Sequence, residues 1–253
     1  MSEVHNEFSL ENKPVMREIP HELAVNLAAF HTVQAVADFS FYRLLKEEEY
    51  LFPKYYKSGD SVLDLACGLG RTTLLLHEMG LAVHGVDRSD LFIQIAKRRL
   101  PYLDLRVGSY DNIEEADSSF SHVLISLNGL DYAYPAAQRF AALQECARVL
   151  KPGGTLIYSS HNLKSLHWFS PYYRNRLIWK ARNSIKAFKE CDYVVEGGVY
   201  TFYASSGFVV GQTEAVGLKM VEMRGFFKLG TGRLDRYFSP YIHYVFTKPE
   251  NGG

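Results

Sequence analysis

The fold of this chain is decided by the stretch Val62-Leu63-Asp64-Leu65-Ala66-Cys67-Gly68-Leu69-Gly70-Arg71. An apolar strand comes first, then an acidic residue, and then a Gly-x-Gly turn that opens a helix. Glycine adopts backbone conformations that other residues avoid, so a glycine turn lets the backbone pass close to a ligand. Because α/β sheets place their ligands at the carboxyl ends of parallel strands, we expect a binding site at this turn.

Outward from this turn, apolar strands alternate with helices along the chain. The sequence predicts strands over residues 61–65, 82–86, 103–107, 122–126, 155–159, 218–223 and 241–247. It predicts helices over 71–79 and 136–150, a short one near Gln212, and one that Ser89 caps and that reaches Leu100. Two further helices are expected between His21 and Tyr50, before Pro53 breaks the pattern. Such alternation indicates βαβ units and a parallel sheet with helices on both faces.

Acidic residues around the turn indicate which kind of ligand it binds. The dinucleotide fingerprint G-x-G-x-x-G/A needs glycine or alanine where this chain has Thr73. Asp64 would repel a pyrophosphate but favours a ligand with a positively charged amino-acid head. Asp87 ends the second strand, 23 residues after Asp64, where a carboxylate reaches the hydroxyls of a ribose. A capping carboxylate in a buried turn is the structural alternative for Asp64, and a helix cap is the alternative for Asp87.

Four segments together resemble the class I, small-molecule S-adenosylmethionine-dependent methyltransferases, of the type 11 or type 25 kind. They are residues 62–71, the strand end at Asp87, residues 148–156 around Lys151-Pro152-Gly153-Gly154, and residues 213–222. The resemblance covers residues 58–160 firmly and 203–248 loosely. The first segment and its spacing from Asp87 are specific, and the Lys-Pro-Gly-Gly turn strengthens the match.

The resemblance implies S-adenosyl-L-methionine as the cofactor and S-adenosyl-L-homocysteine as its product. Asp64, Gly68 and Gly70 would hold the methionine part, Asp87 the ribose, and Arg88 would flank the adenine. Ser109 stands where the family usually has Asp, which puts a carboxylate contact to the adenine amine in doubt. The full set of implied cofactor-binding residues is Asp64, Ala66, Gly68, Gly70, Asp87, Arg88, Ser109, Tyr110, Asp111, Ser126, Leu127 and Asn128.

We therefore expect an α/β fold with a Rossmann-like, seven-stranded, mostly parallel sheet. Residues 1–57 would form an N-terminal arm and cap helices, and residues 58–160 the S-adenosylmethionine-binding core. Residues 161–203 would form a lid after the fifth strand, and residues 204–253 the C-terminal part of the sheet.

The expected lid is rich in aromatic residues and interrupts the strand–helix alternation. Between Lys164 and Lys189 it carries seven basic residues and no Asp or Glu, which would favour an anionic or aromatic substrate. A solvated basic helix face is the alternative. The expected substrate-binding residues are Tyr42, Asp131, Tyr132, Trp168, Arg174, Arg176 and Trp179.

Methyl transfer from a sulfonium is an in-line displacement that needs aligned atoms and the exclusion of water. A base is required only where the nucleophile must lose a proton. His161, just beyond the fifth strand, is the first candidate base, and His167 is the second. A polar residue with a structural role is the alternative for His161, and a core residue is the alternative for Tyr42.

Composition narrows the possible partners and the location. Lys plus Arg and Asp plus Glu each number 28, and a net charge of zero argues against long nucleic acids as partners. Three cysteines without a C-x-x-C pair argue against a disulfide scaffold or a zinc site and fit a reducing cytoplasm. No run of eighteen apolar residues indicates a membrane span. We expect a cytoplasmic protein with a small-molecule substrate, no nucleic-acid or membrane partner and no metal; a homodimer is left open.

Together these observations predict a methyltransferase that modifies an O or N atom of a small molecule, anionic or aromatic. One alternative is a nucleotide-dependent oxidoreductase with a Rossmann domain. Another is a non-catalytic scaffold with the methyltransferase fold. The sequence leaves the substrate open.

Overall fold

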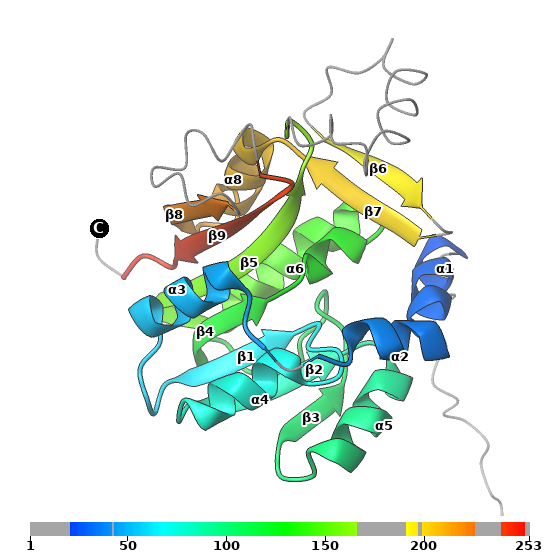
Figure 1. Cartoon of the computed structure of the whole chain (residues 1–253). Helices are drawn as coiled ribbons and strands as arrows, with labels where there is room; N and C mark the ends of the chain where they lie inside the picture. Colours follow the sequence, from blue (N-terminus) through cyan, green and yellow to red (C-terminus); the bar gives the residue numbers. More distant parts are fainter. Residues whose placement is uncertain (1–20, 42, 166–190, 197–198, 226–238, 251–253) are drawn as a thin grey trace, which may run out of the picture.

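A mixed β-sheet runs through the middle of the molecule (Figure 1). The computed structural model describes residues 21–41, 43–165, 191–196, 199–225 and 239–250. Five parallel strands lie in the order β3-β2-β1-β4-β5, and β9 and β8 follow beside β5. Their bounds are β1 Ser61–Leu65, β2 Ala82–Asp87, β3 Asp104–Val107, β4 Phe120–Ile125, β5 Leu150–Asn162, β8 Lys219–Gly225 and β9 Tyr241–Thr247. The predicted seven-stranded, mostly parallel sheet is confirmed, because within this set β9 alone runs in the opposite direction to the other six strands.

A hairpin that the sequence did not predict extends this sheet. Its strands are β6 (Cys191–Glu196) and β7 (Val199–Ala204), which pair antiparallel. His161 of β5 pairs with Tyr241 of β9 and also with Tyr203 of β7. Since β4 pairs with β5 only as far as Tyr158, β7 occupies the place beyond the carboxyl end of β4. The hairpin therefore lies at the edge of the sheet where a ligand is expected.

Helices cover both faces of the sheet, as predicted. On one face, α6 (Ala136–Val149) and α8 (Ser206–Glu214) pack against the apolar residues of β1, β4, β5 and β9. On the other face lie α4 (Arg71–Glu78), α5 (Asp90–Arg99) and α3 (Lys46–Tyr55). The Ser89 hydroxyl accepts the Phe92 N–H at 3.2 Å, so Ser89 caps α5 as its position predicted. No helix in the described part of the chain is long and apolar enough to span a membrane.

The N-terminal region differs from the prediction in two details. It holds three helices rather than two: α1 (His21–Phe30), α2 (Val33–Phe39) and α3. Pro53 does not break the pattern but lies inside α3, which ends two residues later. A proline this close to the C-terminus removes a single helical hydrogen bond, and α3 gains stability at its other end from three consecutive glutamates in its first turn.

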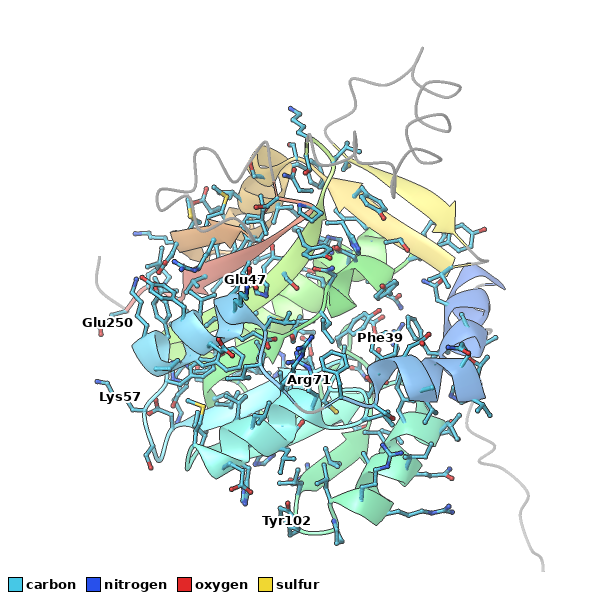
Figure 2. The ribbon with its side chains drawn as sticks, in the orientation of Figure 1. Phe39, Glu47, Lys57, Arg71, Tyr102 and Glu250 are labelled. Atoms are coloured by element: carbon cyan, nitrogen blue, oxygen red, sulfur yellow. The ribbon has the colours of Figure 1, made fainter. Side chains whose placement is uncertain are left out.

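A buried ion pair fastens α3 to the helix that follows the glycine turn. The two terminal nitrogens of the Arg71 guanidinium, Nη1 and Nη2, donate to Glu48, each at 2.7 Å, and Nη2 also donates to Ser126 Oγ at 2.6 Å. The side chains of Arg71 and Glu48 are only 6% and 1% exposed. Figure 2 shows Arg71 in the interior, whereas Lys57 and Tyr102 extend away from the fold. Burial opposes the charge of Glu48, but the hydrogen bonds and charge of Arg71 outweigh it and lower the pKa of Glu48.

Removing one member of this pair should cost more stability than any surface pair contributes. Glu48→Gln would leave the Arg71 charge buried without a counter-ion, and we expect a loss of about 3–5 kcal/mol in the free energy of unfolding. Lys54→Met, which breaks the surface pair with Glu222, should stay within about 1 kcal/mol of wild type. Urea unfolding followed by circular dichroism measures both, and equal effects of the two changes would contradict this assignment.

Candidate active site

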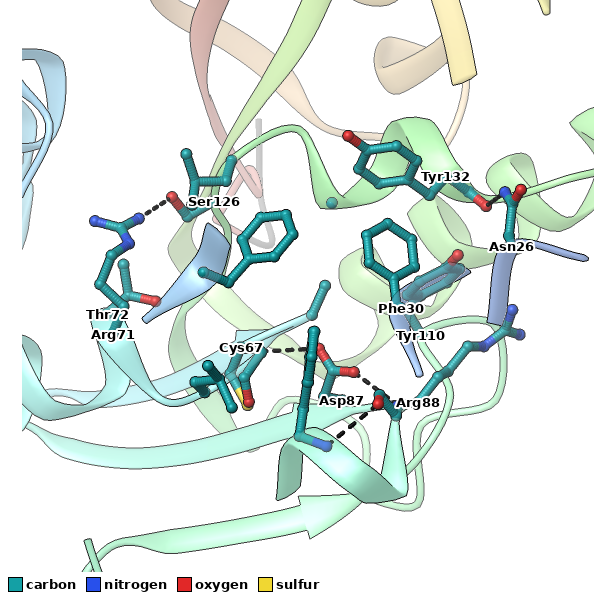
Figure 3. A pocket seen from close by; sticks show the side chains of 18 of the residues that line it. Asn26, Phe30, Cys67, Arg71, Thr72, Asp87, Arg88, Tyr110, Ser126 and Tyr132 are labelled. Carbon is teal, nitrogen blue, oxygen red and sulfur yellow. Dashed lines mark hydrogen bonds between the residues drawn. The ribbon is translucent and has the colours of Figure 1, made fainter. Parts of the chain in front are cut away.

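A cleft opens at the carboxyl ends of β1, β2 and β4, where the glycine turn lies (Figure 3). Its empty volume is about 880 Å³ including the open mouth, which suits a ligand of cofactor size. Its floor comes from the sheet edge, and its roof comes from α1 and α2. The lining residues are Asn26, Leu27, Phe30, Phe39, Ala66, Cys67, Gly68, Leu69, Arg71, Thr72, Asp87, Arg88, Ser89, Phe92, Tyr110, Ser126, Leu127, Gly129 and Tyr132.

The glycine turn has the backbone conformation that its sequence requires. Ala66, Gly68 and Gly70 all have positive φ, of 55°, 58° and 83°. Gly70 is also packed closely, because a Cβ there would lie 3.1 Å from Leu100 Cδ1. Alternate residues in left-handed conformation fold the backbone into a tight loop, and Ala66 and Gly68 line the cleft while Gly70 lies behind it.

Asp87 holds the turn from the neighbouring strand. Its two carboxylate oxygens accept the N–H groups of Gly68 and Ser89, each at 2.8 Å. Burial raises the pKa of Asp87, and the two backbone hydrogen bonds offset this only in part. Because Asp87 also lines the cleft, its remaining lone pairs can accept hydrogen bonds from a ligand.

Asp64 lies under the turn rather than in the wall of the cleft. It is fully buried, and its Oδ2 accepts the hydroxyls of Thr72 and Thr73, each at 2.7 Å. Its Oδ1 has no hydrogen-bond partner. Burial raises the pKa of Asp64 to about 6 despite the two hydroxyl hydrogen bonds. Thr73, which departs from the dinucleotide fingerprint, is therefore used to hold this carboxylate.

Arg88 organises the side of the cleft next to β3. Its guanidinium donates to Ser109 Oγ and to Asp111 Oδ1 at 2.6 Å, and it stacks over the Tyr110 ring at 4.5 Å. Gln138 of α6 completes the network by donating to Asp111 Oδ2 at 2.8 Å. Arg88 and Tyr110 line the cleft, whereas Ser109 and Asp111 lie behind them as the residues that hold Arg88 in place.

The loop after β4 forms another wall of the cleft. Leu127 and Asn128 both have positive φ, of 48° and 59°, which is uncommon for residues other than glycine and marks a constrained turn. Ser126 and Leu127 line the cleft, while Asn128 turns away and its N–H donates to Ser159 Oγ at 2.8 Å.

Asp131, in the short helix η1 (Gly129–Tyr132), binds a cluster of polar groups behind that wall. Its Oδ1 accepts from Arg139 at 2.8 Å, and its Oδ2 lies 2.8 Å from His161 Nδ1 and accepts the His161 N–H at 2.7 Å. Asp131 and Arg139 are completely buried. Asp131, predicted to bind substrate, and His161, the predicted base, are thus in contact, but neither residue lines the cleft, whereas the neighbouring Tyr132 does.

Several predicted site residues lie outside the described part of the chain, namely Tyr42, His167, Trp168, Arg174, Arg176 and Trp179. Conversely, the sequence reasoning missed further residues of the cleft. Some lie next to predicted ones, and five lie apart from them: Asn26, Leu27, Phe30, Phe39 and Phe92. Four of the five come from the N-terminal helices, where the apolar spacing indicated helices but gave no sign of what they cover. The aromatic residues of these helices were the signal in the sequence that could have indicated a role in the cleft.

Residues 62–154 match the family model described as a methyltransferase domain. This segment of the chain is therefore similar to methyltransferase domains. Among curated proteins, a demethylmenaquinone methyltransferase of Paenarthrobacter aurescens is 34% identical over 119 residues, which are 47% of this chain and 44% of that protein. A putative methyltransferase of Bacillus subtilis is 31% identical over 105 residues, 40% of this chain and 42% of that protein. The chain thus spans about half the length of the curated relatives it matches.

Solved structures agree on the fold of the methyltransferase domain and its surroundings. A S-adenosylmethionine-dependent methyltransferase of Methanosarcina mazei superimposes with a TM-score of 0.63 at 20% identity, covering 80% of this chain and 98% of that one. A methyltransferase of Haloferax volcanii, solved in complex with the activator Trm112, gives a TM-score of 0.61 at 20% identity, with 92% and 98% covered. The predicted resemblance and Rossmann-like fold are confirmed, and the family implies S-adenosylmethionine as the cofactor.

Asp64 should make the stability of this domain depend on pH. Its folded-state pKa of about 6 lies above the ordinary value of 3.8, so ionised Asp64 opposes folding. That cost is absent below about pH 4 and complete above about pH 6. Asp64→Asn should therefore gain roughly 3 kcal/mol relative to wild type as pH rises from 4 to 7, at 1.36 kcal/mol per unit.

Asp60→Asn is the control, because its stability relative to wild type should change with pH in the opposite direction. Burial opposes the charge of Asp60, but its hydrogen bond to His122 and other contacts outweigh this and lower its pKa. Asp60 therefore contributes stability above the unfolded pKa, and its variant should lose stability as pH rises. Urea unfolding at several pH values measures both, and parallel pH profiles for Asp64→Asn and wild type would contradict the burial argument.

Proposed function

We propose that the protein is an S-adenosylmethionine-dependent methyltransferase that transfers a methyl group to an O or N atom of a small molecule. The observation that carries the proposal is the pair of carboxylates around the glycine turn, Asp64, which is fully buried, and Asp87, which lines the cleft. Neither has a cationic side chain within hydrogen-bonding distance among the described contacts. A site with uncompensated negative charge favours a cationic ligand and disfavours a pyrophosphate.

The residues of the cleft fit the parts of that cofactor. Asp87 would accept the ribose hydroxyls, and Arg88 with Tyr110 would flank the adenine. The turn at Ala66 and Gly68 would hold the methionine part, with Asp64 acting beneath the turn as a buried negative charge. When bound, the cofactor supplies a methyl group on a positively charged sulfur, and the chain's own residues must exclude water and align the acceptor.

Aromatic rings dominate the roof of the cleft, which supports an aromatic acceptor. Phe30 and Tyr132 meet edge to face at 5.0 Å, and Phe39 lies 6.1 Å from Phe92. Arg71 and Arg88, the two cationic residues that line the described cleft, are already paired with carboxylates. Several relatives are named for a quinone substrate, demethylmenaquinone, which agrees with a ring-shaped acceptor. The basic residues that would favour an anion lie largely outside the described residues.

We further propose His161 as the base that accepts a proton from the acceptor. Asp131, fixed by Arg139, holds His161 through Nδ1, and this leaves Nε2 as the nitrogen that can take a proton. Asn128 Nδ2 lies 3.4 Å from Nε2, so the ring faces the loop after β4. A small-molecule partner without nucleic acid and a cytoplasmic location complete the proposal. They are supported by the zero net charge and by three cysteines without a C-x-x-C pair.

Calorimetry tests the proposed cofactor. S-adenosylhomocysteine should bind the wild-type protein and NAD should not. Asp87→Ala removes charge-assisted hydrogen bonds worth roughly 1.5–3 kcal/mol each, so affinity should fall at least about tenfold. Asp117→Ala is the matched control, because Asp117 is exposed and does not line the cleft. Binding of NAD alone would favour the oxidoreductase instead.

His161→Asn tests the proposed base. With a panel of phenols and amines as acceptors, release of S-adenosylhomocysteine should fall by about 10²- to 10⁴-fold, the usual contribution of a general base. Binding of S-adenosylhomocysteine should not change. His122→Asn is the matched control, because His122 also contacts an aspartate, Asp60 at 3.0 Å, but at the opposite ends of the strands. Full transfer by His161→Asn would assign His161 a structural role, and cofactor binding without transfer to any acceptor would favour a scaffold.

A further inference from the structure

The roof of the cleft, residues 26–39, is attached to the rest of the molecule at few points. Phe30 and Phe39 touch Phe92 at ring-centroid distances of 6.4 and 6.1 Å. His31 lies 3.0 Å from Asp90, but these side chains are 39% and 56% exposed, so solvent weakens their attraction. The roof nevertheless covers Gly68 and Asp87, the residues proposed to bind the cofactor.

Among the described contacts, one side chain makes the buried polar attachment of this roof. Asn26, only 3% exposed, donates from Nδ2 to the carbonyls of Tyr132 and Tyr200, each at 3.0 Å. Its Oδ1 accepts the Tyr200 N–H at 2.7 Å. Figure 3 shows Asn26 reaching from α1 to the backbone at Tyr132. A single amide thus joins α1 to η1 and to β7, which follow it in the chain by more than one hundred residues.

We propose that Asn26 is a positioning residue that holds the roof closed over the cofactor. The proposal rests on the proposed function, because it assigns the cleft to S-adenosylmethionine. An asparagine side chain offers two donor hydrogens and an acceptor on a short stem, which matches the two carbonyls and the N–H it meets. Asp cannot donate to the carbonyls, and Leu can neither donate nor accept. Without the amide, the carbonyls of Tyr132 and Tyr200 and the Tyr200 N–H lose the hydrogen bonds that join them to α1, and the seam between roof and wall opens to water.

A closed roof would slow the dissociation of the bound cofactor. In this proposal, opening the seam at Asn26 widens the way out for a ligand under Leu27, Phe30 and Phe39. The rate of dissociation therefore depends on the strength of the Asn26 contacts, while the floor residues set the remaining affinity. The same contacts fix Tyr132, which lines the cleft beside Phe30. The roof therefore keeps its position relative to η1.

The test compares Asn26→Leu with Gln34→Leu. Gln34 is the matched control because it lies on the same roof, is exposed, and hydrogen-bonds only to Asp38 within α2 among its described contacts. Stopped-flow displacement measures the dissociation rate of S-adenosylhomocysteine, and hydrogen exchange measures the protection of residues 26–39 in the ligand-free protein. We expect Asn26→Leu to raise the dissociation rate at least about tenfold and to lose roof protection. The core strands should stay protected, and Gln34→Leu should match wild type.

Unchanged dissociation and unchanged roof protection in Asn26→Leu would overturn the proposal. So would a loss of protection that extends equally through residues 61–125, because Asn26 would then support the whole fold. If Asn26→Leu does not fold, Asn26→Asp, which keeps the bond from the Tyr200 N–H, must show both changes, and wild-type values there overturn the proposal as well. Should the wild-type protein bind no S-adenosylhomocysteine, the proposed function fails, while hydrogen exchange of the ligand-free protein still decides the role of Asn26.

Discussion

The ion pair between Glu48 and Arg71 is the interaction on which the geometry of the cleft depends. Arg71 is the first residue of α4, directly after the glycine turn, and it also donates to Ser126 at the end of β4. Glu48 brings α3 to the same point. Two charges buried together gain little net stability over apolar side chains of the same size, because desolvation offsets most of their attraction. Their bidentate geometry is specific, however, and it sets the position of the turn relative to β4 and α3.

Negative charge remains on the floor once this pair has formed. Arg71 is paired with Glu48, and Arg88 with Asp111, so neither guanidinium forms an ion pair with the carboxylates at the turn. Asp64 and Asp87 are held by hydroxyls and backbone N–H groups instead, and burial raises the pKa of both. Carboxylates held in this way favour the binding of a cationic ligand. The methyltransferase domain that the comparisons identify is consistent with that preference.

Much of this arrangement followed from local sequence. The turn at Gly68 and Gly70, the carboxylate at Asp87 and the cap at Ser89 each depend on residues close in the chain, and the structure places them as expected. Bonds between distant segments did not follow from the sequence. Nothing in the spacing of Glu48 or Asn26 indicates Arg71 or Tyr200 as partners, since a helix pattern reports only which face is apolar. The hairpin at β7 was missed because its strand residues lie in an aromatic-rich segment without clear alternation.

The two long-range contacts serve different demands on the same cleft. The floor must be rigid, because two carboxylates without a cation remain in place only if the backbone around them is fixed, and a bidentate buried ion pair supplies that rigidity. The roof must admit a ligand and then exclude water, so it is joined by aromatic contacts and by one amide that bonds to backbone groups without carrying charge. Breaking neutral hydrogen bonds to a backbone that water can solvate costs far less than separating buried charges. The weaker contact, made by Asn26, therefore lies on the side that the proposed opening of the roof would expose to a ligand. The stronger contact, between Glu48 and Arg71, lies beneath the residues that would bind the ligand.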